Sequence, residues 1–234
     1  MVRTFARIQV AIAATADLDK ARIPHLAVAG LPALFDTLIE EALDQHAANW
    51  AAPGNALVPR FATPADFLRH LVPFRRRVRA WTVELLAGGW PDSIDHDDLQ
   101  GSNAVVRPDG QTLIYDWDES IISCPFFSLD RLARDTRSFA PCVPPRPAPQ
   151  RDALPFTPGE LALRDAYTEG IPWNTSAARE RAFDLAMRLV PIKHAAYDRV
   201  LVRARATIDP KWEHWQPASL GIAGALRRWE SIRP

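Results

Sequence analysis

Two oxygen-bearing side chains, Asn103 and Asp116, lie on either side of a short turn at a spacing that could bring them to one metal ion. Between them, Asp109 and Gly110 are a preferred pair for a two-residue β-hairpin turn. Counting outward from such a turn sets Asn103 opposite Asp116, with their Cβ atoms about 5 Å apart. Because Mg²⁺ prefers carboxylate and amide oxygens and keeps waters and phosphates for its other positions, the pattern predicts a magnesium site on this hairpin.

A further carboxylate, Asp98, stands five residues before Asn103 and two residues after His96. The string has the form H-x-D-x-x-x-x-N, the spacing of the kinase catalytic loop, in which the Asp takes the hydroxyl proton and the Asn holds metal. Thirteen residues after Asn103, Asp116 occupies the position of the kinase metal-binding Asp. Phosphoryl transfer suits this set, because it needs a positioned nucleophile, a nearby carboxylate and a metal, with little covalent help from the protein.

Together with the segment Cys124-Pro-Phe-Phe-Ser-Leu129, these residues resemble the aminoglycoside phosphotransferase family, which includes choline kinase-like and homoserine kinase-like enzymes. The resemblance implies a kinase-like fold that transfers the γ-phosphate of ATP, or sometimes GTP, to a hydroxyl of a small-molecule acceptor. It implies that Asp98 is the catalytic base and that His96 braces the loop. It also implies that Asn103 and Asp116 bind Mg²⁺ and, with it, the nucleotide.

The chain departs from the family pattern at two positions. Asp97 stands where the family usually has Gly, and Gln100 stands where it often has His. Asp97 removes backbone freedom and adds a carboxylate beside the base, and we expect it to be solvated and not catalytic. Asp118 and Glu119 have two interpretations, because they could support the metal site or belong to a solvated turn.

The elements around the hairpin are predicted to be helices. Apolar spacing indicates helices over residues 4–18, 31–43, 64–87, 127–139, 160–168, 176–206 and 221–232, and short strands over 104–106 and 113–115. Thr63 and Pro64 are typical of a helix start. Pro73 should kink or split its helix, and Pro191 should break the long one. The sequence therefore predicts a mainly α fold with a small β-hairpin.

The expected fold is the C-terminal lobe of a kinase-like protein, without its β-rich N-terminal lobe. The residues before His96 have helical patterns, with no Gly-rich loop preceding a strand, and Lys20 lies in a polar helical end. We expect one domain over residues 1–234, with the catalytic loop and metal-binding hairpin at 94–120, a Pro-rich connection at 141–158 and C-terminal helices at 159–234. Without the missing lobe, water would not be excluded from the transfer site and activity would suffer.

The overall composition limits the classes of binding partner and the cellular compartment that we expect for this protein. The formal net charge is zero, with 47% hydrophobic and 24% charged residues, which argues against nucleic acid or an anionic membrane as partner. Two cysteines are too few for a disulfide framework. There is neither an apolar run long enough to span a bilayer nor a signal peptide at the start, so we expect a cytoplasmic protein.

Two other functions stay open at this point. One is a catalytically inert kinase-like lobe, or a gene fragment with a binding role, which the missing N-terminal lobe favours. The other is a nucleotide-sugar glycosyltransferase, since Asp116-Trp117-Asp118 is also a D-x-D pattern. That pattern does not account for His96, Asp98 and Asn103, and the expected βα repeats are not predicted.

Overall fold

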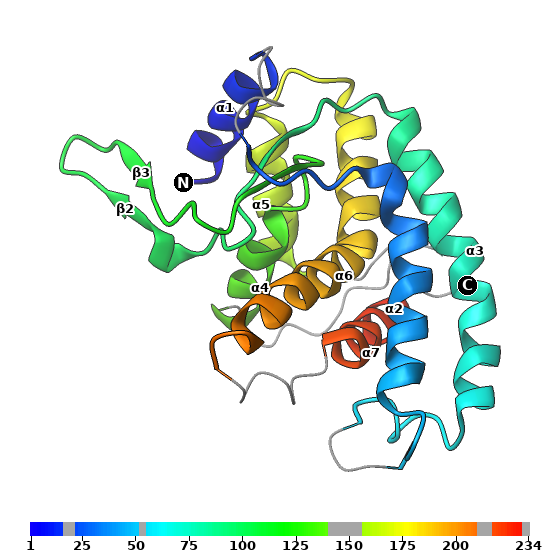
Figure 1. Ribbon diagram of the computed structural model, residues 1–234. Helices are drawn as coiled ribbons and strands as arrows, with labels where there is room; N and C mark the ends of the chain where they lie inside the picture. The colour runs from blue at the N-terminus through cyan, green and yellow to red at the C-terminus, as the bar shows by residue number, and fades with distance from the viewer. Residues whose placement is uncertain (16–21, 52–54, 140–155, 210–216, 231–234) are drawn as a thin grey trace. The chain divides into compact units, whose positions relative to one another are not determined.

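Helices make up most of the chain, as the sequence predicts (Figure 1). The computed structural model describes residues 1–15, 22–51, 55–139, 156–209 and 217–230. They form two compact units, of which unit 1 is built from Met1–Val28 and Leu85–Met187, and unit 2 from Ala29–Glu84 and Arg188–Ser231. None of the described helices is long and apolar enough to cross a membrane.

Unit 1 holds two short antiparallel sheets, one of which is the predicted hairpin. Its elements are α1 (Val2–Ala13), β1 (Ser93–Asp95), the 3-10 turn η3 (Gly101–Asn103), β2 (Ala104–Val106), β3 (Thr112–Ile114), β4 (Ile121–Ser123), α4 (Leu129–Phe139), α5 (Pro158–Thr168) and the first part of α6 (Ser176–Ala206). β1 pairs with β4, and β2 pairs with β3. The sequence did not predict β1 and β4, because each is only three residues long, too short for a periodic pattern to stand out.

Buried Gln9 joins α1 to the start of the candidate site. Its amide nitrogen donates to the carbonyl oxygens of Ile94 at 2.7 Å and Pro125 at 3.0 Å. The Tyr167 hydroxyl of α5 donates to the Gln9 side-chain oxygen, and Ser93 Oγ donates to the Gln9 carbonyl at 2.8 Å. Every polar atom of Gln9 thus has a partner, and β1 is held where it leads into His96.

Unit 2 is a set of helices around an aromatic core. The unit contains η2 (Val28–Gly30) in part, α2 (Leu31–Gln45), most of α3 (Pro64–Ala87), the later part of α6 and α7 (Pro217–Glu230). Trp229 of α7 packs against Phe35, Phe74 and Trp81, with ring centroids 5.3 to 5.7 Å apart. Its indole N–H donates to the Arg188 carbonyl at 2.7 Å, so this large side chain is buried with its one donor satisfied.

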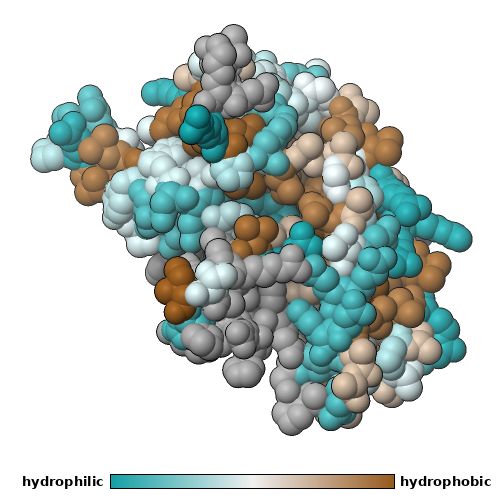
Figure 2. Space-filling view, viewed as in Figure 1, coloured by the Kyte–Doolittle hydropathy of each residue, from teal (hydrophilic) through white to brown (hydrophobic). Residues whose placement is uncertain are grey.

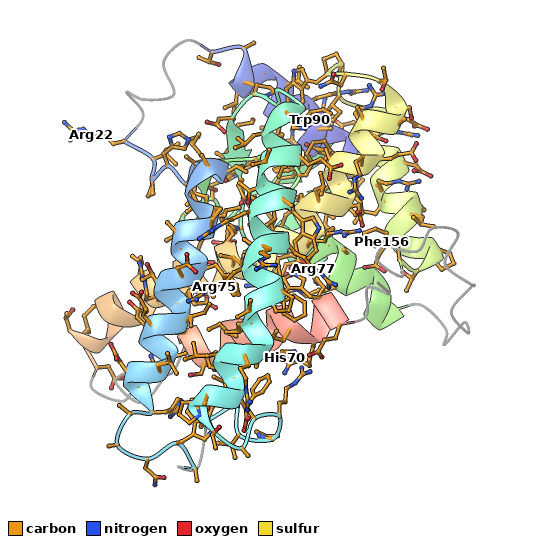
Figure 3. All side chains as sticks on the ribbon, turned by 90° about the vertical axis from the view of Figure 1, so that its right-hand side faces the viewer. Arg22, His70, Arg75, Arg77, Trp90 and Phe156 are labelled. Atoms are coloured by element: carbon orange, nitrogen blue, oxygen red, sulfur yellow. The ribbon has the colours of Figure 1, made fainter. Side chains whose placement is uncertain are left out.

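The start and buried seam of α3 are as predicted. Thr63 Oγ1 accepts from the Asp66 amide at 3.1 Å. The seam of Phe67, Leu71, Phe74, Val78, Trp81 and Leu85 is buried throughout. Arg75 lies on the side of α3 that faces α2, whereas Arg77 and His70 lie on its other side (Figure 3). Arg75 forms an ion pair with Asp36 of α2 at 2.9 Å.

Neither internal proline divides its helix, so the predicted break at Pro191 and a split at Pro73 were wrong. Pro73 lies within α3 and Pro191 within α6, and both helices are continuous. Pro73 and Arg69, whose carbonyl loses its helical donor, are both on the exposed side. Water can therefore satisfy that carbonyl while the buried seam keeps the two halves of α3 in line.

Several predicted segments lie partly or wholly outside the described residues. Residues 140–155 hold most of the predicted Pro-rich connection, whose last residue, Pro158, is the first of α5. Lys20 is also outside the described ranges. The final predicted helix is confirmed with different ends, since α7 begins at Pro217 and ends at Glu230.

Candidate functional site

The β2–β3 hairpin is closed by a three-residue loop, so the predicted two-residue turn was wrong. The Arg107 amide donates to the Gln111 carbonyl at 2.8 Å, and the Gly110 amide donates to the Arg107 carbonyl at 2.9 Å. Gly110 has a φ of 82°, as expected for the left-handed residue that follows a type I turn in such loops. Pro108 explains why the loop has three residues and not two. It has no N–H to donate to the Gln111 carbonyl, as a two-residue turn would require, and its fixed φ suits the second position of a type I turn.

The longer loop shifts the strand register by one residue. Asn103 stands opposite Tyr115, whose amide donates to the Asn103 carbonyl at 3.1 Å. The predicted opposition of Asn103 and Asp116 was therefore wrong. Asp116 lies two residues beyond the end of β3 and adopts a left-handed φ of 69°, which is incompatible with continued strand geometry. Its carboxyl still lies close enough to Asp98 and His96 for their charges to act on its pKa.

His96 links the loop to the hairpin. Its ring Nε2 donates to the carbonyl oxygen of Tyr115 at 3.0 Å, and its amide donates to Ser128 Oγ at 3.1 Å. The ring packs on Trp117, with centroids 4.5 Å apart, and has an edge contact with Phe5. His96 is 0% exposed, so its contacts are structural, and they fix the residue directly before Asp116.

Asp97 is buried, which contradicts the prediction that it is solvated. It is 2% exposed and has a left-handed φ of 61°. Its amide donates to Asp95 Oδ1 at 3.1 Å, and the same oxygen accepts from Ser128 Oγ at 2.8 Å. A left-handed backbone favours Gly, and Asp is among the few other residues that adopt it.

Asp98 and Asn103 are hydrogen-bonded to each other. Asn103 Nδ2 donates to the Asp98 carbonyl at 2.9 Å and to its Oδ2 at 3.0 Å. Gln100 Nε2 donates to the same Oδ2 at 2.8 Å. The amide oxygen of Asn103 accepts a long hydrogen bond from Ser102 Oγ at 3.4 Å, and its second lone pair can serve a metal ion. Two of the predicted site residues thus lie in direct contact.

Asp116 lies among other carboxylates. A hydrogen bond with Asp118 is the main cause that raises its pKa above the ordinary value, followed by desolvation and the negative charges of Asp118 and Asp98. The charge of His96 acts in the opposite direction. Neighbouring negative charges disfavour the ionised form of Asp116, and a nearby cation would act in the opposite direction.

Glu119 belongs to the same acidic surroundings. Burial is the largest cause that raises its pKa, and the charges of Asp97, Asp98 and Asp118 raise it further. Arg131 of α4 lowers it in part. Arg131 Nε also lies 3.6 Å from Asp98 Oδ1, an ion-pair distance. Glu119 is therefore an electrostatic neighbour of the site, which favours a supporting role over a purely solvated turn.

Asn103 and Asp116 have the chemistry of a magnesium site with few protein ligands. Across the described ranges, no group of three or more His, Cys, Asp or Glu side chains is placed to hold a metal ion. Mg²⁺ needs fewer, since it is commonly held by one or two carboxylates together with substrate phosphates and water. An amide oxygen, a carboxylate and excess negative charge nearby fit such an ion.

Several site residues were not found from the sequence. Asp95, Ser128 and Arg131 come from two elements more than thirty residues apart, β1 and the segment around α4. Their one local signal was their charge or polarity, such as Arg131 in the first turn of a helix, where a cation is unfavourable. Only the fold shows that they meet the loop from His96 to Asn103.

Comparison of the chain with protein-family models, with curated proteins and with solved structures gives no match. A proposed function therefore depends on the contacts of His96, Asp98, Asn103 and Asp116 and on the chemistry that they can support.

Proposed function

We propose that this chain carries the transfer site of a phosphotransferase that moves the γ-phosphoryl group of ATP or GTP to a hydroxyl of a small molecule. The observation that supports it most is the double contact from Asn103 Nδ2 to Asp98. It sets a carboxylate base beside an amide ligand, while His96 ties the same loop to the residue before Asp116. A base and two oxygen ligands are what this reaction requires of a protein.

Asp98 is the proposed base, and its two oxygens have different tasks. Oδ2 accepts from two amide groups and so fixes the carboxylate. Oδ1 is then the oxygen that takes the proton of the acceptor hydroxyl. The acceptor oxygen forms a bond to the γ-phosphorus as the bond from that phosphorus to the β–γ bridging oxygen breaks. The nucleoside diphosphate leaves with that electron pair.

Asn103 and Asp116 are the proposed Mg²⁺ ligands. When bound, the ion neutralises charge on the phosphate oxygens. Asp116 follows β3 in a left-handed backbone conformation and is exposed, as a group that meets a nucleotide must be. The crowding by Asp118 and Asp98 that raises its pKa favours a cation at the same place.

The glycosyltransferase alternative has less support. A nucleotide-sugar site of that class would need parallel βα repeats, whereas the strands of the described residues form two-stranded antiparallel sheets. Asp118, the second Asp of the D-x-D pattern, is hydrogen-bonded to the first. The inert-lobe alternative predicts no magnesium-dependent nucleotide binding, and the experiment below separates it from transfer.

Binding of Mg-ATP by calorimetry tests the proposal directly. Wild type should bind in a magnesium-dependent manner, and Asp116→Asn should lose that binding because it removes a charged ligand at nearly constant shape. Asp109→Asn is the matched control, since Asp109 lies on the same hairpin, in its loop, and keeps an oxygen for the Gln111 amide. Absence of magnesium-dependent binding in wild type would refute the proposal.

A further inference from the structure

Arg131 stands at an unusual place for a cation. It lies in the first turn of α4, close to the positive end of the helix dipole, where acidic side chains are preferred. The same turn contains Asp130, which is buried and pairs with Arg134 one turn later. Helix stability therefore accounts for Asp130 and Arg134 but gives no reason for Arg131.

The guanidinium of Arg131 is directed at Asp98. Its Nε is 3.6 Å from Asp98 Oδ1, which is an ion-pair distance but too long for a hydrogen bond. That Nε is buried and has no hydrogen-bond partner in the part of the chain that the structure describes. The two side chains are 38% and 24% exposed, so the pair lies at the opening of the site, only partly screened by water.

The carboxylate of Asp98 needs a second restraint if it is to act as a base. Gln100 and Asn103 hold one oxygen, Oδ2. The χ2 torsion of an Asp side chain has a broad energy minimum. Hydrogen bonds to one oxygen therefore still allow the other oxygen to change its position. Arg131 supplies an attraction on the Oδ1 side, against the repulsion from the neighbouring carboxylate of Glu119.

We propose that Arg131 is a positioning residue that holds Oδ1 of Asp98 toward the acceptor hydroxyl. This role rests on the proposed phosphotransferase function. It differs from a phosphate contact, because a positioning residue acts on the rate of transfer and leaves nucleotide affinity nearly unchanged. Arg131→Met and Arg131→Lys distinguish the two roles.

The kinetic test uses Mg-ATP with glycerol at high concentration as a general hydroxyl probe, and follows nucleoside diphosphate release. Arg131→Met should lower kcat about tenfold or more, since small misplacements of reacting groups have effects of that size, while KM for Mg-ATP stays within about twofold. Arg131→Lys, or guanidinium added to Arg131→Ala, should restore part of the rate. Arg3→Met is the matched control, because it removes a 2.7 Å ion pair with Glu169 elsewhere in unit 1.

A second measurement needs no nucleotide. In a double-mutant cycle of Asp98→Asn and Arg131→Met, the shifts in the urea midpoint should be non-additive if the pair interacts. Additive shifts, an unchanged kcat, or a raised KM for Mg-ATP at constant kcat would each overturn the positioning role. A third outcome is non-additive shifts in a protein that binds no Mg-ATP. The contact between Arg131 and Asp98 would then be real, but the proposed function would be refuted, and the positioning role with it.

Discussion

Both units bury aromatic side chains, but unit 1 buries more polar ones. Around the candidate site, unit 1 buries His96, Asp97 and Asn103, and holds Asp97 and Asp116 in left-handed backbone conformations. The centre of unit 2 buries Trp229 among other aromatic rings, and even its buried Arg188 lies over the Trp81 ring at 5.2 Å. Buried polar groups and left-handed non-glycine residues reduce stability, so their concentration in unit 1 is the expected mark of a functional site.

Truncation of the aromatic core should give the largest effect on stability. Trp229→Ala should lower the free energy of unfolding by about 3 to 5 kcal/mol, because it removes a fully buried indole and leaves a cavity. Urea unfolding followed by circular dichroism measures it. Trp229→Phe, which keeps a ring in the same place, should lose clearly less. A Trp229→Ala loss below about 1 kcal/mol would mean that the aromatic cluster is not the centre of unit 2.

Asp98→Asn should reverse that pattern, with a large loss of function at little cost in stability. We expect phosphoryl transfer to fall about 10²- to 10³-fold, since the base can no longer accept a proton, while Mg-ATP binding persists. The urea midpoint should stay close to wild type, because the substitution keeps the shape and removes one of several crowded negative charges. Turnover like that of wild type would exclude Asp98 as the base.

Two glycines of α7 provide a smaller, matched test of packing in unit 2. A Cβ at Gly221 would lie 2.2 Å from the Cβ of Ala195, whereas a Cβ at Gly224 would meet only the end of the Arg227 side chain at 3.8 Å. Gly221→Ala should therefore destabilise by about 1 to 3 kcal/mol through overpacking. Gly224→Ala should stabilise by about 0.5 to 1 kcal/mol, as is usual in a helix interior. Equal effects would contradict the close approach of α6 and α7.

One carboxyl in each unit should make the free energy of unfolding depend on pH, and the two contributions should have opposite signs. These effects should be the smallest of those predicted here. Burial tends to raise the pKa of Glu230, but hydrogen bonds from Arg60 and His70 outweigh it and hold the pKa below its ordinary value. Glu230 therefore stabilises the folded state above the unfolded pKa of about 4.3, and this is lost as the pH falls through the lower folded pKa. The pKa of Asp116 is raised in the folded state, so its ionisation destabilises the folded protein as the pH rises above the ordinary pKa of an Asp side chain.

Unfolding midpoints of wild type and Glu230→Gln across pH 3 to 6 would measure this contribution. The difference between the two proteins should shrink as the pH falls, because protonated Glu230 resembles Gln. Asp116→Asn should change the midpoint in the opposite direction at the upper end of that range. If both substitutions shifted the unfolding midpoint in the same direction, the proposed electrostatic difference between the two units would be incorrect.

The sequence predicted those features that depend on neighbouring residues. The periodic seam of α3 and its Thr63 start were confirmed, and the spacing of Asp98 and Asn103 does bring them together, since five residues of loop suffice for the contact. The hairpin register was missed by one residue, because the Asp109-Gly110 pair was given more weight than the missing N–H of Pro108.

Long-range features could not be predicted in the same way. The burial of Asp97 depends on how β1 and the segment before α4 pack around it, and Ser128 reaches His96 from thirty-two residues away. Arg131 and Asp98 are likewise far apart in the sequence. No local pattern encodes such contacts, because they follow from the packing of the complete unit.

The loop of the β2–β3 hairpin has a consequence for insertions and deletions. Its tip is exposed, and apolar side chains lie along the strands below it, at Val105, Val106 and Leu113 (Figure 2). The tip should accept many substitutions, provided that Gly110 is kept. Deletion of Pro108 would leave the two-residue turn Asp109-Gly110 between the same pair, Arg107 and Gln111, so Asn103 would stay opposite Tyr115. In a library of variants, a loop one residue shorter should therefore be tolerated without a change of register, whereas Gly110 should stay constant.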